Sequence, residues 1–257
     1  MRNILIIARR DLRAQFNSPV AYVVLGGTMF LLGVVFFLIP HISGVLAGSF
    51  WDVDRASMDQ MFATLPLLLS IFVIPAVTMR TLAAEKGSGT LELLITMPVK
   101  DSEVILGKYL AAFAMVLILL LATLLYPLAM FKWPWNLGPL DWGPVWAGYL
   151  GCVLFSAAAL AVGMMISSLT ESDVIAFFAT LGVLGCLYVI GYAVSVVQTD
   201  AKGWTAIVDG LGFISFQSRY QAFARGLVDT RAIVYFLSVT VLCLLVSFRS
   251  LESRKWS

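Results

Sequence analysis

The stretch RTLAAEKGSGTLELLITMPVKDSEVILGK, residues 80–108, lies between two long apolar runs and carries charges of alternating sign. Within it, apolar residues recur at the spacing of one helical face: Leu91, Leu94, Ile95 and Pro98. A short amphipathic helix at the end of membrane helices suits pressing onto another protein or lying at the membrane interface. We therefore expect the remaining apolar segments to be organised around this polar segment.

The composition of the chain predicts a lipid environment. Of its 257 residues, 60% are hydrophobic and 12% are charged, whereas a soluble domain carries about 25% charged residues. We therefore expect an integral membrane protein. Because the N-terminus is charged and no small-x-small cleavage site follows a short apolar core, we expect no cleavable signal peptide. The cysteines Cys152, Cys186 and Cys243 lie inside apolar runs and form no disulfide or metal-binding pattern.

Six apolar runs have about the length of a membrane span, which is about 20 residues. They are residues 20–39, 64–79, 109–131, 146–168, 174–197 and 232–248, and as bounded here they contain no ionisable side chain. The second and sixth runs are short, so we expect them to extend into their flanks. Because only LTESD separates the fourth run from the fifth, these two should form a helical hairpin.

A helix start is predicted just before the third run. Asp101 is placed to cap it, since a carboxylate there accepts from free backbone N–H groups. Glu103 in the first turn suits the helix dipole.

Residues 1–17, MRNILIIARRDLRAQFN, predict a basic amphipathic helix that is too polar to span. Its apolar face is expected to hold Ile4, Leu5, Ala8, Leu12 and Phe16. Its membrane-surface cations are expected to be Arg9, Arg10 and Arg13. The alternative is an ordinary basic flank. Ser18-Pro19 should then turn the chain into the bilayer.

Residues 198–231 form an unusual segment before the last run. Two apolar stretches, 204–208 and 211–216, are interrupted by Asp209-Gly210, and each is too short to span. We expect a re-entrant or surface helical hairpin, because non-helical backbone at membrane depth must be buried in protein. An amphipathic piece over 217–224 should end near Gly226. The alternative is a plain outer loop with an interfacial helix.

Loop cations predict the orientation. One side of the six runs holds eleven of them: Arg2, Arg9, Arg10, Arg13, Arg80, Lys86, Lys100, Lys108, Arg249, Arg254 and Lys255. The other side holds six: Arg55, Lys132, Lys202, Arg219, Arg225 and Arg231. We therefore expect both termini and residues 80–108 to lie in the cytoplasm.

The sequence offers no catalytic set of its own. His41 is the only histidine, and the apolar runs carry no acids. Residues 87–90, GSGT, lack the GxxxxGK[ST] pattern of a phosphate loop. We expect no catalytic residue, metal or cofactor in this chain. Since ion-coupled transporters place ionisable groups in the membrane, energy for any transport should enter from outside the chain through residues 80–108.

Six spans, a basic N-terminal helix and the stretch AAEKGSGTLELLITMPVKDSEVILGKYLA together resemble an ABC-2 type transporter permease. The closest resemblance is to the gliding-motility-type branch, which is also similar to the permease of the nitrous oxide reductase maturation transporter. The tail FARGLVDTRAIVYFLSVTVLCLLVSFRSLESRKW is similar to the ending of that branch.

The resemblance implies an all-α membrane protein with one transmembrane domain over residues 1–257. It would be a non-catalytic permease subunit in a bacterial inner membrane. It would pair with a second copy as a homodimer and would not bind nucleic acid. Each copy would dock on one subunit of an ATPase dimer, which binds ATP and Mg. An additional periplasmic or membrane subunit could join them, and the outer hairpin would gate or cap the path.

The resemblance also places a coupling helix within residues 84–98. The residues matching the family motif are Glu85, Lys86, Gly89, Thr90, Leu91, Glu92, Leu94 and Pro98. We expect Leu91, Leu94 and Ile95 to fill an apolar groove on the ATPase. Glu85 and Glu92 are expected to pair with basic residues at its rim, where each pair contributes about 0–1 kcal/mol.

Other readings stay open at this point. A channel or secondary transporter would need internal repeats or intramembrane polar groups, and an intramembrane enzyme would need a nucleophile and a base. A permease-like scaffold that transmits ATP-driven movement to outer partners without passing a substrate fits the same residues. The uncharged runs favour a lipid-like, hydrophobic or peptide cargo over a small ion.

Overall fold

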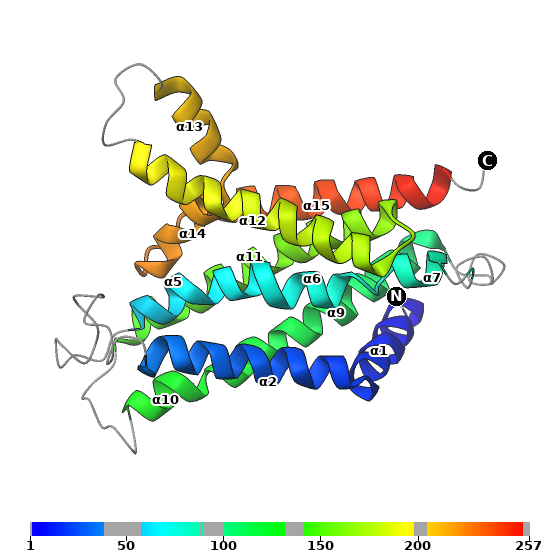
Figure 1. Ribbon diagram of the computed structural model, residues 1–257, viewed down its shortest axis with the longest axis horizontal. Helices are drawn as coiled ribbons and strands as arrows, with labels where there is room; N and C mark the ends of the chain where they lie inside the picture. Colours follow the sequence, from blue (N-terminus) through cyan, green and yellow to red (C-terminus); the bar gives the residue numbers. More distant parts are fainter. Residues whose placement is uncertain are drawn as a thin grey trace.

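The structure, a computed structural model, describes residues 2–38, 58–87, 89, 100–131, 141–197 and 205–253. Within these ranges the secondary structure is helical (Figure 1). Six of the described helices are long and apolar enough to cross a membrane: Pro19–Phe36, Gln60–Gly87, Asp101–Ala129, Trp142–Leu169, Asp173–Gly191 and Thr230–Glu252. This confirms the six predicted spans, including the extension of the second and sixth into their flanks.

The first three spans are built from shorter pieces. After the N-terminal helix α1 (Arg2–Asn17), these are α2 (Pro19–Gly33), η1 (Val34–Leu38), α5 (Asp59–Leu68), η2 (Leu69–Val73), α6 (Ile74–Thr78), α7 (Ala83–Gly87), α9 (Asp101–Thr123) and α10 (Leu125–Phe131). The second span changes from α-helix to the π-helical turn η2 between Pro66 and Pro75. Proline disturbs the local hydrogen-bond ladder, and Ser70 Oγ donates to the Pro66 carbonyl at 2.8 Å.

The last three spans are continuous. They are α11 (Trp142–Leu169), α12 (Asp173–Val197) and α15 (Thr230–Ser253), with α13 (Thr205–Ile214) and α14 (Phe216–Ala224) before α15. α11 and α12 form the predicted hairpin. The predicted turn at Ser18-Pro19 is also confirmed, since the Ser18 hydroxyl accepts from the Val20 N–H at 3.4 Å and α2 begins at Pro19.

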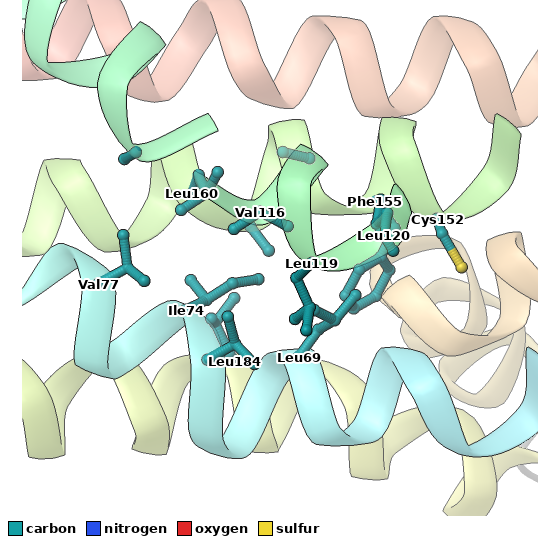
Figure 2. Packing of buried hydrophobic residues seen from close by; sticks show 14 of the residues in the cluster. Leu69, Ile74, Val77, Val116, Leu119, Leu120, Cys152, Phe155, Leu160 and Leu184 are labelled. Atoms are coloured by element: carbon teal, nitrogen blue, oxygen red, sulfur yellow. The ribbon is translucent and has the colours of Figure 1, made fainter. Parts of the chain in front are cut away.

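α11 is the central helix of the bundle. In its span 72% of the residues of an apolar window are buried, against 22% for α15. Figure 2 shows Leu69 and Ile74 of the second span and Leu119 of α9 gathered beside α11. Small side chains on α11 permit close contact, because a Cβ added at Gly163 would lie 2.5 Å from Thr78 Oγ1.

α14 is packed into the end of the bundle opposite α1. Phe216, Tyr220 and Phe223 are buried, and Phe155 of α11 makes edge-to-face contacts with both Phe216 and Tyr220, at ring-centroid distances of 5.6 and 6.0 Å. Such pairs stabilise beyond the area they bury. The amphipathic piece ends as predicted, with Gly226 at a φ of 82°.

The break between the two halves of this hairpin lies at a different place from the predicted one. α13 continues through Asp209-Gly210, and the chain turns at Ser215. The Ser215 hydroxyl accepts from the Ser218 N–H at 3.3 Å and so caps α14. The depth of α13 and α14 in the membrane stays a prediction.

The start of α9 also differs from the predicted one in its cap. Lys100 occupies the N-cap position, and Asp101 is the first helical residue. The Glu103 carboxylate accepts from the Lys100 N–H at 3.4 Å, so the acid one turn into the helix supplies the acceptor. Because the helix begins at Asp101, Lys108 lies two turns inside it and is not a loop residue.

The packing at Gly163 generates a prediction. Gly163→Ala should destabilise the protein by about 1–3 kcal/mol, because the Thr78 side chain is buried and held by a 2.8 Å hydrogen bond to Ile74 O. The measurement is the thermal unfolding of the purified protein in detergent. Gly182→Ala on α12 is the matched control, since a Cβ there meets nothing within 4 Å. Equal melting temperatures for the two variants would contradict the proposed close packing.

Candidate functional site

One end of the bundle brings together α1, α7, the start of α9, the turn between α11 and α12, and the end of α15 (Figure 1). We call it the basic end. Its described cations include Arg9, Arg10, Arg13, Arg80, Lys86, Lys108 and Arg249. It is also the end from which the predicted coupling segment leaves the bundle.

A buried ion triad joins three elements at the basic end. Lys108 of α9 is 4% exposed. Its ammonium lies 2.6 Å from Glu85 Oε1 on α7 and 3.2 Å from Asp11 Oδ2 on α1. An ammonium removed from water needs compensating charge and hydrogen bonds. The two carboxylates provide both, so the triad ties α1 and α7 to the third span.

The first turn of α7 is held by α11. The Ser167 hydroxyl accepts from the Leu82 N–H at 3.2 Å and from the Ala83 N–H at 3.0 Å. The first N–H groups of a helix have no partner within that helix. Ser167 therefore caps the N-terminus of α7, although it belongs to a different span.

The end of α11 is held in turn by its neighbours. The Ser168 carbonyl accepts from the Lys86 ammonium and, at 3.0 Å, from the Ser250 hydroxyl of α15. A cation near the last carbonyls of a helix also suits its dipole. At Gly87 an added Cβ would lie 2.6 Å from the Glu171 carbonyl oxygen in the α11–α12 turn. α7 is thus fixed against the hairpin of the fourth and fifth spans.

α1 packs along the first turns of α9. Asn3 Nδ2 donates to Glu103 Oε2 at 3.1 Å, and a Cβ added at Gly107 would lie 2.7 Å from Ile7 Cγ2. Leu5 of the predicted apolar face is 66% exposed and does not pack on the bundle. Ile7 lies on the side of α1 that meets Gly107 of α9.

A cavity of about 230 Å³ lies beside the triad, between α1, α2, α6 and α9. Asp11, Arg80 and Lys108 are among the side chains that line it. Arg80 Nε lies 3.7 Å from Asp173 Oδ2, a long ion pair between half-exposed groups that holds the two only weakly. The cavity leaves room for these side chains to rearrange.

The structure places only part of the predicted coupling set. Glu85 and Lys86 lie on α7, and Gly89 follows it with a φ of 70°. Residues Thr90, Leu91, Glu92, Leu94, Ile95 and Pro98 lie outside the described residues. The membrane-surface set Arg9, Arg10 and Arg13 is exposed on α1, and Arg10 Nη2 pairs with Asp11 Oδ1 at 2.9 Å.

Sequence reasoning missed three residues of this site: Asp11, Lys108 and Ser167. Asp11 lies within the predicted basic helix, where a single acid gives no sign of a buried ion pair. Lys108 was predicted to be a loop cation, although the helix start signals around residue 101 would have placed it inside a helix. Ser167 carries no signal in the sequence, because an isolated serine near the end of an apolar run is ordinary. Its partners lie 84 and 85 residues earlier in the chain.

Comparison with known families gives one match. The sequence model described as "ABC-2 family transporter protein" matches residues 52–249, which include α7, α9, α11, α12 and α15 over most of their lengths. A comparison with curated proteins finds no match.

The triad generates a prediction about stability. Lys108→Met should cost about 3 kcal/mol or more of unfolding free energy, because it removes the buried cation that Glu85 and Asp11 share, and Asp11 keeps only its pair with Arg10. Adding Asp11→Asn and Glu85→Gln to the same chain should recover most of that loss. Arg249→Gln is the control, since the Arg249 side chain is 85% exposed and its ion pair contributes little. A Lys108→Met protein as stable as wild type would contradict the triad.

A second prediction concerns the start of α7. Ser167→Ala should speed amide hydrogen exchange at Leu82 and Ala83, because their N–H groups lose an acceptor whose loss costs about 1–2 kcal/mol. Hydrogen exchange read by mass spectrometry measures this. Ser247→Ala is the control, since the Ser247 hydroxyl only donates to the carbonyl one turn earlier on α15. Unchanged exchange at both amides would show that Ser167 does not hold α7.

Proposed function

We propose that this chain, which belongs to the ABC-2 family of transporter proteins, couples ATP hydrolysis by a separate ATPase subunit to the export of a substrate. It is the multi-pass membrane permease component of such a transporter. Permease domains of this kind are normally non-catalytic, so ATP and Mg belong to the partner ATPase. Family membership does not give three parts of this proposal. These are the direction of transport, the identity of the coupling residues and the composition of the assembly.

One observation supports the coupling role most strongly: α7, which we call the stem of the segment, is attached to two other spans, α9 and α11. Ser167 holds the start of α7, the Ser168 carbonyl accepts from Lys86, and Glu85 pairs with Lys108. A packed interior does not deform continuously. Force applied to residues 88–99 would therefore move α9 and the α11–α12 hairpin as rigid elements.

We assign different tasks to the two halves of the segment. Glu85 and Lys86 hold the stem, because both already have partners within the chain. Leu91, Leu94 and Ile95 would enter an apolar groove on the ATPase, and Pro98 would follow them in the chain. Glu92 would pair with a basic residue of the ATPase at the rim of that groove. Buried apolar anchors carry most of the energy in such interfaces. Closure of the ATPase dimer would then push the stem and, through Lys108 and Asp11, displace α1.

The remaining parts of the proposal concern the surroundings. The basic end would face the cytoplasm of a bacterium, in agreement with the bias of Lys and Arg toward that side. The most exposed spans, those of α2, α12 and α15, leave apolar faces for lipid and for a second copy in a homodimer. Exposed Leu5 and Ile6 on α1 suit contact with the membrane interface. Assignment to the gliding-motility-type branch rests on sequence resemblance.

The coupling role is tested by co-purification of this chain with co-expressed candidate ATPase subunits. Leu94→Asp should abolish recovery of the ATPase and its permease-dependent turnover, because an unpaired carboxylate is costly in an apolar groove. Leu94→Met is the matched control, since it keeps an apolar side chain of similar volume. The melting temperature of the permease alone should be the same in all three proteins. Retained binding and turnover in Leu94→Asp would overturn the coupling assignment.

A further inference from the structure

An open groove of about 700 Å³ lies at the end of the bundle opposite the basic end. It is bordered by α13, α14 and the start of α15. Side chains from all three line it: Phe213, Arg219, Arg231, Val234, Tyr235 and Ser238. It is separate from the coupling segment, since α7 and the ion triad lie at the other end (Figure 1).

The side chains that line the groove carry positive charge; the acid beside it, Asp229, does not line it and accepts from the Arg231 backbone N–H at 2.9 Å. Arg219 and Arg231 supply two guanidinium groups, and none of the described residues that line the groove carries a carboxylate. The ion pairs found between described residues involve neither arginine. Arg219 Nε is buried and has no hydrogen-bond partner among the described residues. Guanidinium groups in this state suit a phosphate, which they bind through paired N–H donors.

Aromatic rings hold Arg219 in place. Its guanidinium carbon lies 4.4 Å from the centroid of the Phe213 ring and 5.7 Å from that of Tyr235. The Tyr235 hydroxyl donates to the Ile214 carbonyl at 2.5 Å, which ties α15 to the end of α13. The cation is therefore positioned before any ligand arrives, so binding orders little additional structure.

An apolar stripe leads away from the groove along α15. Val234, Val241 and Leu245 are 61%, 57% and 55% exposed, and their spacing places them with Ser238 along one helical face. This stripe runs from the two arginines toward the middle of a membrane span. Charge at the membrane boundary followed by apolar surface within the span matches a phospholipid, with its phosphate above an acyl chain.

We propose that this groove binds an anionic phospholipid. The lipid phosphate lies between Arg219 and Arg231, and one acyl chain lies along Val234, Val241 and Leu245. The lipid comes from the leaflet opposite the basic end. This site goes beyond the proposed transport function and does not rest on it, because lipid binding needs neither the ATPase nor the coupling segment.

The test measures lipid retained by the purified full chain. The protein is placed in mixed micelles with equal amounts of phosphatidylglycerol and phosphatidylcholine, and bound lipid is counted by native mass spectrometry. Wild type should retain phosphatidylglycerol in preference. The double substitution Arg219→Gln and Arg231→Gln should lower that retention about tenfold. Arg225→Gln is the matched control, because it removes an exposed cation next to α14 that does not line the groove.

Two further variants distinguish a loss of lipid binding from unfolding of the protein. Arg231→Gln alone changes an exposed residue and should lower retention by a smaller factor with an unchanged melting temperature. Arg219→Lys keeps the charge but not the paired donors, and its retention should lie between those of wild type and the double variant.

Several outcomes would overturn the proposal. Equal retention of the two lipids, or an equal effect of Arg225→Gln, would show that the groove does not select an anionic headgroup. Displacement by millimolar inorganic phosphate, or equally tight binding of glycerophosphoglycerol, would indicate a soluble-anion site without an acyl-chain contact. A change of oligomeric state in the double variant with lipid retention intact would assign the groove to a second copy of the chain.

Discussion

A lysine ammonium cannot be withdrawn from water without a compensating charge, and the arrangement of the basic end follows from this requirement at position 108. Lys108 lies two turns into the third span and is buried there. The compensating carboxylates come from Asp11 and Glu85, which lie on two other elements. Both elements must approach α9 for the charge to be neutralised. The ion triad thus sets where α1 lies and where the proposed coupling segment begins.

The two ends of the bundle are held by different kinds of interaction. At the basic end the contacts are polar, through the Ser167 hydroxyl, the Ser168 carbonyl and the triad. At the other end they are aromatic, around Phe155. Polar networks depend on exact partners, while aromatic packing depends on shape.

α11 connects these two regions. Ser167 and Ser168 near its end hold α7, and Phe155 nearer its start packs on α14. Gly151 permits a close approach of α14, since an added Cβ would lie 2.5 Å from Phe223 Cβ. Because α11 is both the most buried span and the one in contact with both ends, we infer that it is the element through which movement of the coupling segment would reach α14.

Several features of this protein follow from local sequence. Six apolar runs must be helices in lipid, because every backbone group has to find its partner within the segment. Ser18-Pro19 and the short turn at 169–173 fix where helices begin and end through local chemistry. These signals need no knowledge of the tertiary structure, and they were predicted correctly. The family resemblance was also visible in the sequence, since its motif is contiguous.

The tertiary structure decided which polar residues act together. Asp11, Glu85 and Lys108 are separated by tens of residues, and hydropathy treats each as a loop charge; their approach depends on how α1 and α7 pack on α9. Packing between helices also makes Ser167 a cap for α7 and places Arg219 and Arg231 in one groove. Periodicity reports the environment along one helix. Contacts between helices depend on close packing at positions such as Gly107 and Gly163, which no single segment specifies.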